Sequence, residues 1–197
     1  MKVPLRFQIT EFDCGSVSLL NCLSYLYERE EIPALLIKQI YKYTLDCYDE
    51  NGNLGNAGTS REAVNKLTRW ITHYANSNNF DILCERLTGN AVSLEKMATC
   101  LADGGVILVR CWQTVEHYVI ITKIKRGKLY IFDPYYLDKT YYAGDRQIKI
   151  VLNQPFTHNR VVSIKRFFAE THQDFALGPV DNRECVLIRR HTRHNAR

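Results

Sequence analysis

The sequence predicts an α+β fold, with a mostly helical N-terminal half and an antiparallel sheet in the C-terminal half. Three observations support this prediction. Apolar residues recur at helical spacing before Gly104, short runs rich in β-branched and aromatic residues follow it, and turn-forming residues bound those runs. The 197 residues, 46% of them hydrophobic, suffice to bury one substantial core. We therefore expect one domain over residues 1–190 and a frayed basic tail over residues 191–197.

The first predicted helix covers residues 14–28. Its apolar residues recur close to the spacing of one helical face: Val17, Leu20, Leu23 and Tyr27. Asp13 is a preferred N-cap residue, and Pro33 indicates a stop shortly after the pattern ends. The helix is therefore expected to begin at or just after Asp13.

Two further helices are expected before the sheet. One covers residues 34–45 and leads into an irregular loop, residues 46–58, which is rich in Asn and Gly. Thr59 is followed three residues later by Glu62, which is the signature of a capping box. A third helix is therefore predicted from this point to about Tyr74.

The C-terminal half contains short runs that are typical of β-strands. They cover residues 106–112, 117–124, 128–132, 147–152, 160–168 and 185–190. Arg126 and Gly127 separate two neighbouring runs, so they predict the tip of a hairpin. Together the runs predict the antiparallel sheet.

The distribution of charge favours a protein that does not bind nucleic acid. The formal net charge is +5, but the last nine residues hold four arginines and no acid: Arg189, Arg190, Arg193 and Arg197. The rest of the chain holds 22 basic and 21 acidic residues. A solvated chain end is the favoured interpretation. The alternative, a nucleic-acid-binding arm, requires an affinity that falls steeply with salt.

Targeting signals and cysteine usage indicate the compartment. Residues 1–12 contain no apolar stretch long enough for a signal peptide, and the longest apolar runs are far shorter than a membrane span. Seven cysteines without a C-x-x-C pair argue against a disulfide framework and against a zinc site with paired ligands. We therefore expect mostly free thiols, no metal site and a cytoplasmic protein.

Cys14 is the candidate nucleophile. A thiol attacks as the thiolate, and the unpaired N–H groups and macrodipole at a helix N-terminus favour that form. Gly15 follows it, and we expect this glycine to leave room for a substrate backbone beside the thiol. A cysteine at a helix start is by itself most often a buried core residue. The assignment therefore depends on its partners.

His117 and Asp133 are the candidate partners. Folding the hairpin about its tip places His117 across from residues 133–135. Directly paired residues on one face have Cβ atoms about 4.5–5.5 Å apart, so the two side chains can hydrogen-bond at the open end of the hairpin. A base whose tautomer and ring plane are fixed by a carboxylate needs this arrangement. The alternative is a structural His-Asp pair.

Gln8 is the candidate oxyanion donor. It precedes Cys14 by six residues, a distance over which an extended segment can curl back. Its amide and the backbone N–H of Cys14 can then converge on the oxyanion of a tetrahedral intermediate. One such donor is worth roughly 3–4 kcal/mol in a comparable hydrolase.

These residues carry a family resemblance. The motifs, in chain order, are Gln8, Asp13-Cys14-Gly15, His117-Tyr118-Val119 and Asp133-Pro134. They resemble those of the bacteriocin-processing, double-glycine peptidases and their stand-alone relatives in the papain-like superfamily, over about residues 5–135. The resemblance implies a papain-like fold, catalytic roles for the four candidate residues, a peptide or protein substrate and no cofactor. Better-known members are fused to a membrane ABC transporter and cleave leader peptides after two glycines.

Two other functions are compatible with the same residues. A papain-like acyltransferase, which the resemblance to phytochelatin synthases allows, would pass the acyl group from Cys14 to an amine or thiol instead of water. A non-catalytic peptide-binding module would hold the peptide without cutting it. The presence of both Cys14 and His117 argues against the binding module.

Overall fold

Three helices make up most of the N-terminal part of the protein. The computed structural model describes residues 1–191, so most of the predicted basic tail lies outside the described residues. The helices are α1, Cys14–Leu26, α2, Ala34–Tyr43, and α3, Arg61–Asn78. The first two begin where the sequence predicts and end two residues earlier. None of the described helices is long and apolar enough to cross a membrane.

The predicted start of α3 is wrong by one residue. Ser60, not Thr59, is the N-cap, and its hydroxyl accepts a hydrogen bond from the backbone N–H of Ala63 at 3.0 Å. The hydroxyl of Thr59 instead accepts from the backbone N–H of Leu45 at 3.1 Å. Because the hydroxyl of Thr59 is bonded to the segment that follows α2, Ser60 rather than Thr59 caps α3. The helix also continues past Tyr74 to Asn78.

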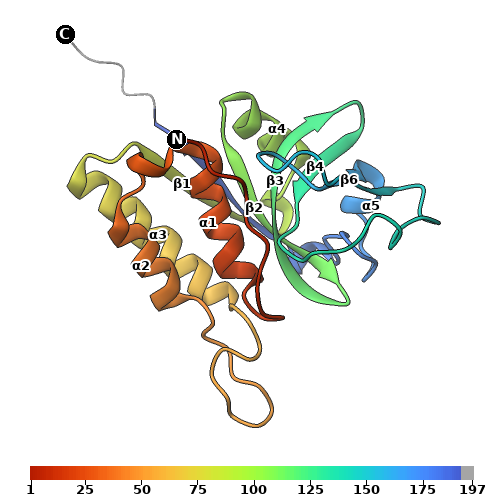
Figure 1. Ribbon diagram of the computed structural model, residues 1–197, viewed down its shortest axis with the longest axis horizontal. Coiled ribbons are helices and arrows are strands. Elements are labelled where there is room, and N and C mark those ends of the chain that lie inside the picture. The colour runs from red at the N-terminus through yellow and green to blue at the C-terminus, as the bar shows by residue number, and fades with distance from the viewer. Residues whose placement is uncertain (192–197) are drawn as a thin grey trace.

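Seven antiparallel strands form one sheet with the order β1-β7-β2-β3-β4-β6-β5 (Figure 1). The strands are β1, Ile82–Thr88, β2, Val106–Gln113, β3, Val115–Lys125, β4, Lys128–Phe132, β5, Ile148–Ile150, β6, Arg160–Ser163, and β7, Glu184–Arg190. The shorter helices are α4, Leu94–Ala102, α5, Ile164–Phe167, and the 3-10 turns Arg29–Glu31, Gly89–Ala91 and Val180–Asn182. Helices followed by an antiparallel sheet confirm the predicted α+β class.

The sequence-based prediction misses β1 and α4 and is partly wrong for residues 160–168. β1 contains the adjacent charged residues Glu85 and Arg86, so it lacks the apolar run by which the other strands are recognised. Within 160–168 only β6 is extended. The hydroxyl of Ser163 accepts from the backbone N–H of Arg166 at 3.1 Å and so caps the short helix α5.

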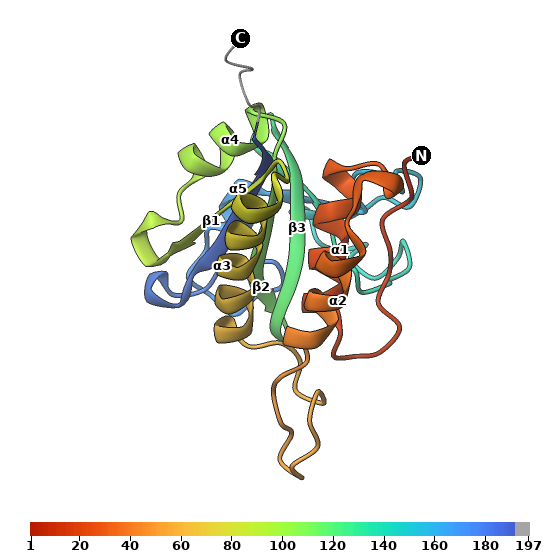
Figure 2. The same cartoon turned by 90° about the vertical axis from the view of Figure 1, so that its left-hand side faces the viewer.

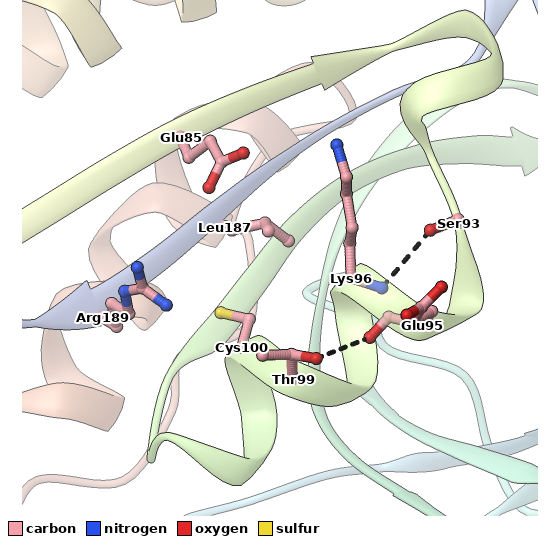
Figure 3. A pocket seen from close by; sticks show the side chains of 8 residues that line it. All are labelled: Glu85, Ser93, Glu95, Lys96, Thr99, Cys100, Leu187 and Arg189. Atoms are coloured by element: carbon pink, nitrogen blue, oxygen red, sulfur yellow. Dashed lines mark hydrogen bonds between the residues drawn. The ribbon is translucent and has the colours of Figure 1, made fainter.

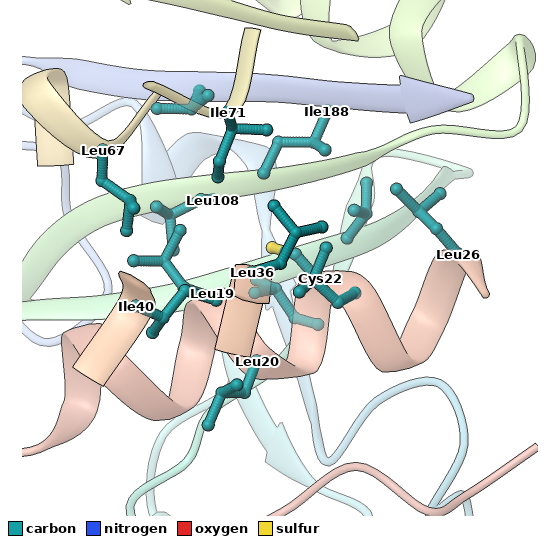
Figure 4. Close-up of a cluster of buried hydrophobic side chains, with 14 of the residues drawn as sticks. Leu19, Leu20, Cys22, Leu26, Leu36, Ile40, Leu67, Ile71, Leu108 and Ile188 are labelled. Carbon is teal, nitrogen blue, oxygen red and sulfur yellow. The ribbon is translucent and has the colours of Figure 1, made fainter. Parts of the chain in front are cut away.

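Two hydrophobic clusters cover the two faces of the sheet. The first packs α1, α2 and α3 against one face, and Figure 4 shows Leu19, Leu108 and Ile188 among its members. Figure 2 shows these three helices in front of β2 and β3. The second cluster packs α4 and α5 against the other face. The central strands are thus buried on both sides, which explains their nearly continuous apolar sequences.

The hairpin of β3 and β4 has the predicted tip and opens at the predicted end. Arg126 and Gly127 have φ angles of 50° and 73°, and Lys125 pairs with Lys128. The pairing continues to Ile120 and Phe132 and goes no further. Beyond these residues the two strands separate, and His117 and Asp133 lie in that opening.

Two of the C-terminal arginines are part of the sheet. Arg189 forms an ion pair with Asp103 at 3.1 Å. Arg190 pairs with Asp81 at 2.7 Å and with Glu31 at 3.0 Å. The carboxylates of Asp103, Asp81 and Glu31 therefore neutralise Arg189 and Arg190, two of the four arginines predicted from the sequence to lie in a solvated chain end.

Candidate active site

His117 and Asp133 form the predicted hydrogen bond. His117 Nε2 lies 2.8 Å from Asp133 Oδ1, and both side chains are buried. The hairpin provides this contact because Asp133 lies one residue and His117 three residues past the last β3–β4 pair, Ile120 with Phe132. A carboxylate on Nε2 fixes the ring plane and directs Nδ1 to the other side.

Several further groups hold the carboxylate of Asp133. Gln113 Nε2 donates to Oδ2 at 3.2 Å, and the backbone N–H of Tyr135 donates to Oδ1 at 2.8 Å. Arg160 Nη2 lies 3.3 Å from Oδ2, and both of these side chains are fully buried. Asn159 bonds to both the backbone N–H and the carbonyl of Asp133, at 2.8 and 2.7 Å. The carboxylate is therefore rigidly oriented toward His117.

The surroundings of His117 favour its protonated form. Burial lowers the pKa of His117, but the carboxylate of Asp133 and hydrogen bonds with Asp133 and Cys14 outweigh burial and raise that pKa to about 10. Burial likewise disfavours ionised Asp133, but His117 and Arg160 hold the pKa of this carboxyl below its ordinary value. Both directions describe one imidazolium-carboxylate pair. A protonated His117 can serve as a proton donor in the reaction.

Cys14 is the first residue of α1 and is 8% exposed. Asp13 precedes the helix as predicted, but its side chain does not cap it. The carboxylate instead accepts from the backbone N–H and the hydroxyl of Thr10, at 3.1 and 3.0 Å. The carboxylate of Asp13 therefore leaves the N–H groups of the first turn available to a negative charge at Cys14.

The helix α1 is attached to β3 next to His117. The hydroxyl of Ser18 donates to the carbonyl of Tyr118 at 2.9 Å. Cys14 lies one turn before Ser18 on the same side of the helix. This attachment brings the thiol close enough to His117 to help raise the pKa of the imidazole. Because Asp133 binds Nε2, Nδ1 is the ring nitrogen left free for Cys14.

The expected role of Gly15 needs correction. A Cβ atom at this position would lie 2.7 Å from Cβ and Oγ1 of Thr59, so the space above the glycine is filled by the protein itself. Gly15 therefore allows close packing of α1 against the chain that precedes α3. It does not leave open room for a substrate backbone.

Gln8 lies beside the site but is bonded within the chain. Its backbone N–H donates to the carbonyl of Pro134 at 2.9 Å, which holds the N-terminal segment against the residue after Asp133. Its side-chain Nε2 donates to the carbonyl of Thr10 at 2.8 Å. The amide nitrogen carries a second N–H, and the predicted oxyanion role requires this donor to face the substrate.

Two hollows flank the Cys14–His117 pair. One, of about 290 Å³, is lined on the thiol side by Cys14, Cys47, Ala57, Gly58, Thr59, Ser60, Arg61, Glu62, Arg110, Glu116 and Tyr118. The other, of about 210 Å³, is lined on the imidazole side by Glu11, Gln113, Thr114, Val115, His117, Tyr135, Leu137 and Tyr141. The two reactive side chains thus lie where an extended chain can pass from one hollow to the other.

No protein-family model matches this chain, and no curated protein sequence matches it significantly. The chemistry of the site must therefore be inferred from its own residues.

The six cysteines other than Cys14 lie in surroundings that favour the neutral thiol. All seven cysteines of the chain are free, as predicted. Burial raises the pKa of each of the other six: Cys22, Cys47, Cys84, Cys100, Cys111 and Cys185. They therefore suit a structural role better than a nucleophilic one.

Another hollow lies away from this site, between α4 and the strands β1 and β7 (Figure 3). Its volume is about 330 Å³, larger than either hollow beside Cys14. None of the eight described residues that line it is a histidine, and burial raises the pKa of its one thiol, Cys100, to about 11. It therefore lacks an activated nucleophile. Within residues 1–191, no group of three or more His, Cys, Asp or Glu side chains is placed to hold a metal ion.

Sequence reasoning did not find Gln113, Asn159 and Arg160. Gln113 is the last residue of β2. The one feature that could have indicated its role is its position at the same end of the sheet as His117. Asn159 and Arg160 reach Asp133 because β6 pairs with β4, with Arg160 opposite Ile131. No local pattern predicts that pairing, since a long segment that contains β5 separates β6 from β4.

Proposed function

We propose that this protein is a papain-like cysteine hydrolase that cleaves a peptide or other amide bond through a thioester on Cys14. One observation carries the proposal: His117 lies beside Cys14, whose thiol helps to raise the pKa of the imidazole, and binds the buried carboxylate of Asp133 through Nε2 at 2.8 Å. A nucleophile, a base and a group that orients the base are the minimum for this chemistry.

In the first half of the reaction, the thiolate of Cys14 adds to the carbonyl carbon of the substrate. The carbonyl oxygen becomes an oxyanion, which the backbone N–H groups at the start of α1 stabilise together with a re-oriented Gln8 amide. Protonated His117 then gives its proton to the leaving amine, and the carbon–nitrogen bond breaks. The acyl group remains on Cys14 as a thioester.

In the second half, neutral His117 takes a proton from water, and the resulting hydroxide adds to the thioester carbonyl. The carbon–sulfur bond breaks, the acid product leaves, and the thiolate of Cys14 faces protonated His117 again. Asp133 holds the imidazole ring in one orientation through both halves.

The proposed substrate is an unstructured peptide with a small residue, in particular glycine, before the cut. The motif resemblance supports this choice. Thr59 supports it as well, because its side chain packs against Gly15 and also lines the hollow beside Cys14. A bulky side chain next to the cut would have to fit beside this wall.

Alkylation mapping tests the assignment of the nucleophile. After brief treatment with iodoacetamide, mass spectrometry should find the adduct on Cys14 well before the other six cysteines react. A His117→Ala variant should lose this selectivity, because the imidazolium that favours the thiolate is gone. First reaction at Cys84 or Cys111 would refute the assignment.

A peptide library tests the reaction. Wild-type protein should cleave unstructured peptides, with a preference for glycine before the cut, while Cys14→Ala should cleave none. Cleavage followed by transfer to an added labelled amine, in preference to water, would identify the acyltransferase alternative. Binding without cleavage would identify a non-catalytic module.

A further inference from the structure

We propose that the hollow beside His117 receives the side chain of the first residue after the scissile bond, and that this side chain is large and apolar or aromatic. The proposal rests on the function proposed above and adds a substrate preference on the leaving side of the cut. The hollow is lined by Val115, Tyr135, Leu137 and Tyr141, with Glu11, Gln113 and Thr114 at its polar edges.

The chemistry fixes which part of the substrate lies on which side. The acyl part stays on the sulfur of Cys14, so the residues before the cut lie toward the hollow that Cys14 lines. The leaving amine takes its proton from His117, so it lies against the imidazole. The hollow that His117 lines therefore faces the residue that begins with that amine.

The lining of the hollow indicates the chemical class of that residue. Val115 is 66% exposed and Tyr141 is 61% exposed, so large apolar groups face solvent here. Exposed apolar side chains gathered around a concave surface are typical of a binding site. The volume of about 210 Å³ is below the range of roughly 300–1,000 Å³ for sites that hold drug-sized ligands. It therefore suits one side chain.

The hollow on the thiol side has a different character. Four charged residues line it: Arg61, Glu62, Arg110 and Glu116. The imidazole side has one charged residue besides His117 itself, Glu11, whose carboxylate lies 3.5 Å from the hydroxyl of Tyr135. A polar stretch before the cut and an apolar residue after it thus match the two sides of the site.

The walls on the imidazole side are held in place without a substrate. The backbone N–H of Tyr135 donates to Asp133, and its carbonyl accepts from Arg160 at 2.8 Å. The ring of Tyr141 packs edge-on against Tyr142, whose hydroxyl donates to Asp174 at 2.8 Å. A preformed wall loses little conformational entropy when a side chain binds to it.

Matched peptides test the proposal. They share one acyl part that ends in glycine and differ only in the residue after the cut, which is Phe, Leu, Gly or Asp. All of them give the same thioester, so differences in kcat/KM report acylation alone. Wild-type protein should prefer Phe or Leu over Gly by about tenfold or more. Tyr141→Ala and Val115→Asn should bring this ratio close to one.

Tyr41→Ala is the matched control, because Tyr41 is similarly exposed, at 57%, but lies on α2. It should leave the ratio unchanged. Alkylation of Cys14 by iodoacetamide, which is too small to need the hollow, should be equally fast in Tyr141→Ala and wild type.

The outcomes separate the two proposals. Cleavage with equal rates for Phe and Gly, or a preference that survives Tyr141→Ala, overturns the subsite and leaves the hydrolase in place. Cleavage of no peptide, together with unselective alkylation of the cysteines, overturns both. Should Val115→Asn fail to fold, Tyr141→Ala decides, because this exposed side chain contributes little to the core.

Discussion

Two buried carboxylates, Asp133 and Glu184, bind neighbouring residues of β3 but have different partners. Their exposed fractions are 0% and 2%. Asp133 accepts from His117, and Glu184 accepts from the hydroxyl of Tyr118 at 2.6 Å. Successive strand residues point to opposite faces, so the side chains of His117 and Tyr118 leave β3 on opposite faces, although Tyr118 also lines the hollow beside Cys14.

Glu184 is surrounded by permanent cations. Arg86 lies 2.7 Å from it, Arg61 3.4 Å and Arg110 3.6 Å. Guanidinium groups in proteins are cations at all ordinary pH values. Glu184 therefore has the partners of a structural ion network, although Arg61 and Arg110 also line the hollow beside Cys14.

Asp133 has one arginine partner, Arg160, at 3.3 Å. It lies closer, at 2.8 Å, to the imidazole of His117, which can lose its proton. That imidazole also reaches the thiol of Cys14. The comparison teaches that burial of a carboxylate does not by itself indicate catalysis. What distinguishes Asp133 is a partner that can change its protonation state and contacts a nucleophile.

The largest expected difference is between His117 and its neighbour Tyr118. His117→Ala, like Cys14→Ala, should lower kcat on the order of 10⁶-fold, because it removes the base and the acid of the reaction. Tyr118→Phe should change kcat only a few-fold and lower the free energy of unfolding by about 1.5–3 kcal/mol, the worth of a hydrogen bond to a charged group. Steady-state kinetics and urea unfolding measure both quantities. Equal, mild losses of kcat in the two variants would mean that His117 is structural.

The carboxylates themselves should separate activity from stability. Asp133→Asn should lower kcat by roughly 10⁴-fold and leave residual activity through a misoriented imidazole. Glu184→Gln should retain most of kcat per folded molecule and lower the free energy of unfolding by about 3–5 kcal/mol, since it leaves three arginines without their carboxylate. Active-site titration with iodoacetamide corrects the rates for unfolded protein. A Glu184→Gln protein that is stable but inactive would contradict the comparison.

The two sites should respond differently to pH. The pKa of His117 is raised from 6.5 to about 10, so the stability it contributes is complete below about pH 6.5 and is lost as pH rises through about 10. Burial raises the pKa of Glu184, but hydrogen bonds from Tyr118 and Arg86 and the nearby arginines hold it below its ordinary 4.5. The stability that Glu184 contributes is therefore present above about pH 4.5 and is lost as pH falls through its lowered pKa.

Urea unfolding across this pH range checks the prediction. The difference in free energy of unfolding between wild type and His117→Gln should shrink on the alkaline side, and that between wild type and Glu184→Gln should shrink on the acid side. The kcat/KM of wild type should also fall as pH approaches about 10, because neutral His117 cannot protonate the leaving amine. An alkaline loss of stability that is identical in wild type and His117→Gln would argue against the imidazolium pair.

The smallest expected effect concerns Arg160. Arg160→Lys keeps the cation beside Asp133 and should lower kcat less than about tenfold, with the alkaline limb of the pH profile in place. Arg160→Met removes the cation, so the carboxylate of Asp133 interacts with His117 alone. The pKa of His117 should then rise, and the alkaline limb of the pH–activity profile should move to higher pH. A stability loss without any shift of that limb would assign Arg160 a purely structural role.

The sequence predicts those parts of the site that depend on local geometry. A two-residue turn joins the strands that lead to His117 and Asp133, so the sequence places both residues at the open end of one hairpin. The register shift between Ile121 and Lys123 is not predictable from the turn. The helix that begins at Cys14 follows from its apolar spacing.

The parts that depend on distant segments could not be predicted. Arg160 reaches Asp133 only through the pairing of β6 with β4, and Thr59 fills the space above Gly15 from the segment that precedes α3. The carboxylate of Asp13 could either cap α1 or accept a hydrogen bond from Thr10, and the residue type alone does not predict which of the two forms. The two hollows likewise arise from segments that are separated in the chain.

Hydrogen bonds hold the base of the loop of residues 46–58, and the tip of the loop is exposed to solvent. The tip is therefore a suitable place to attach a label. The backbone N–H of Gly55 donates to the carbonyl of Cys47 at 2.8 Å, and Asp46 accepts from Ser60. The loop projects from the end of the molecule where α1 begins (Figure 1). Asn51 and Gly52 at its tip are exposed, and each doubling of loop length costs only about 0.6 kcal/mol. A fluorophore or affinity peptide inserted there would extend into solvent, at the far end of a loop whose base lines the hollow beside Cys14.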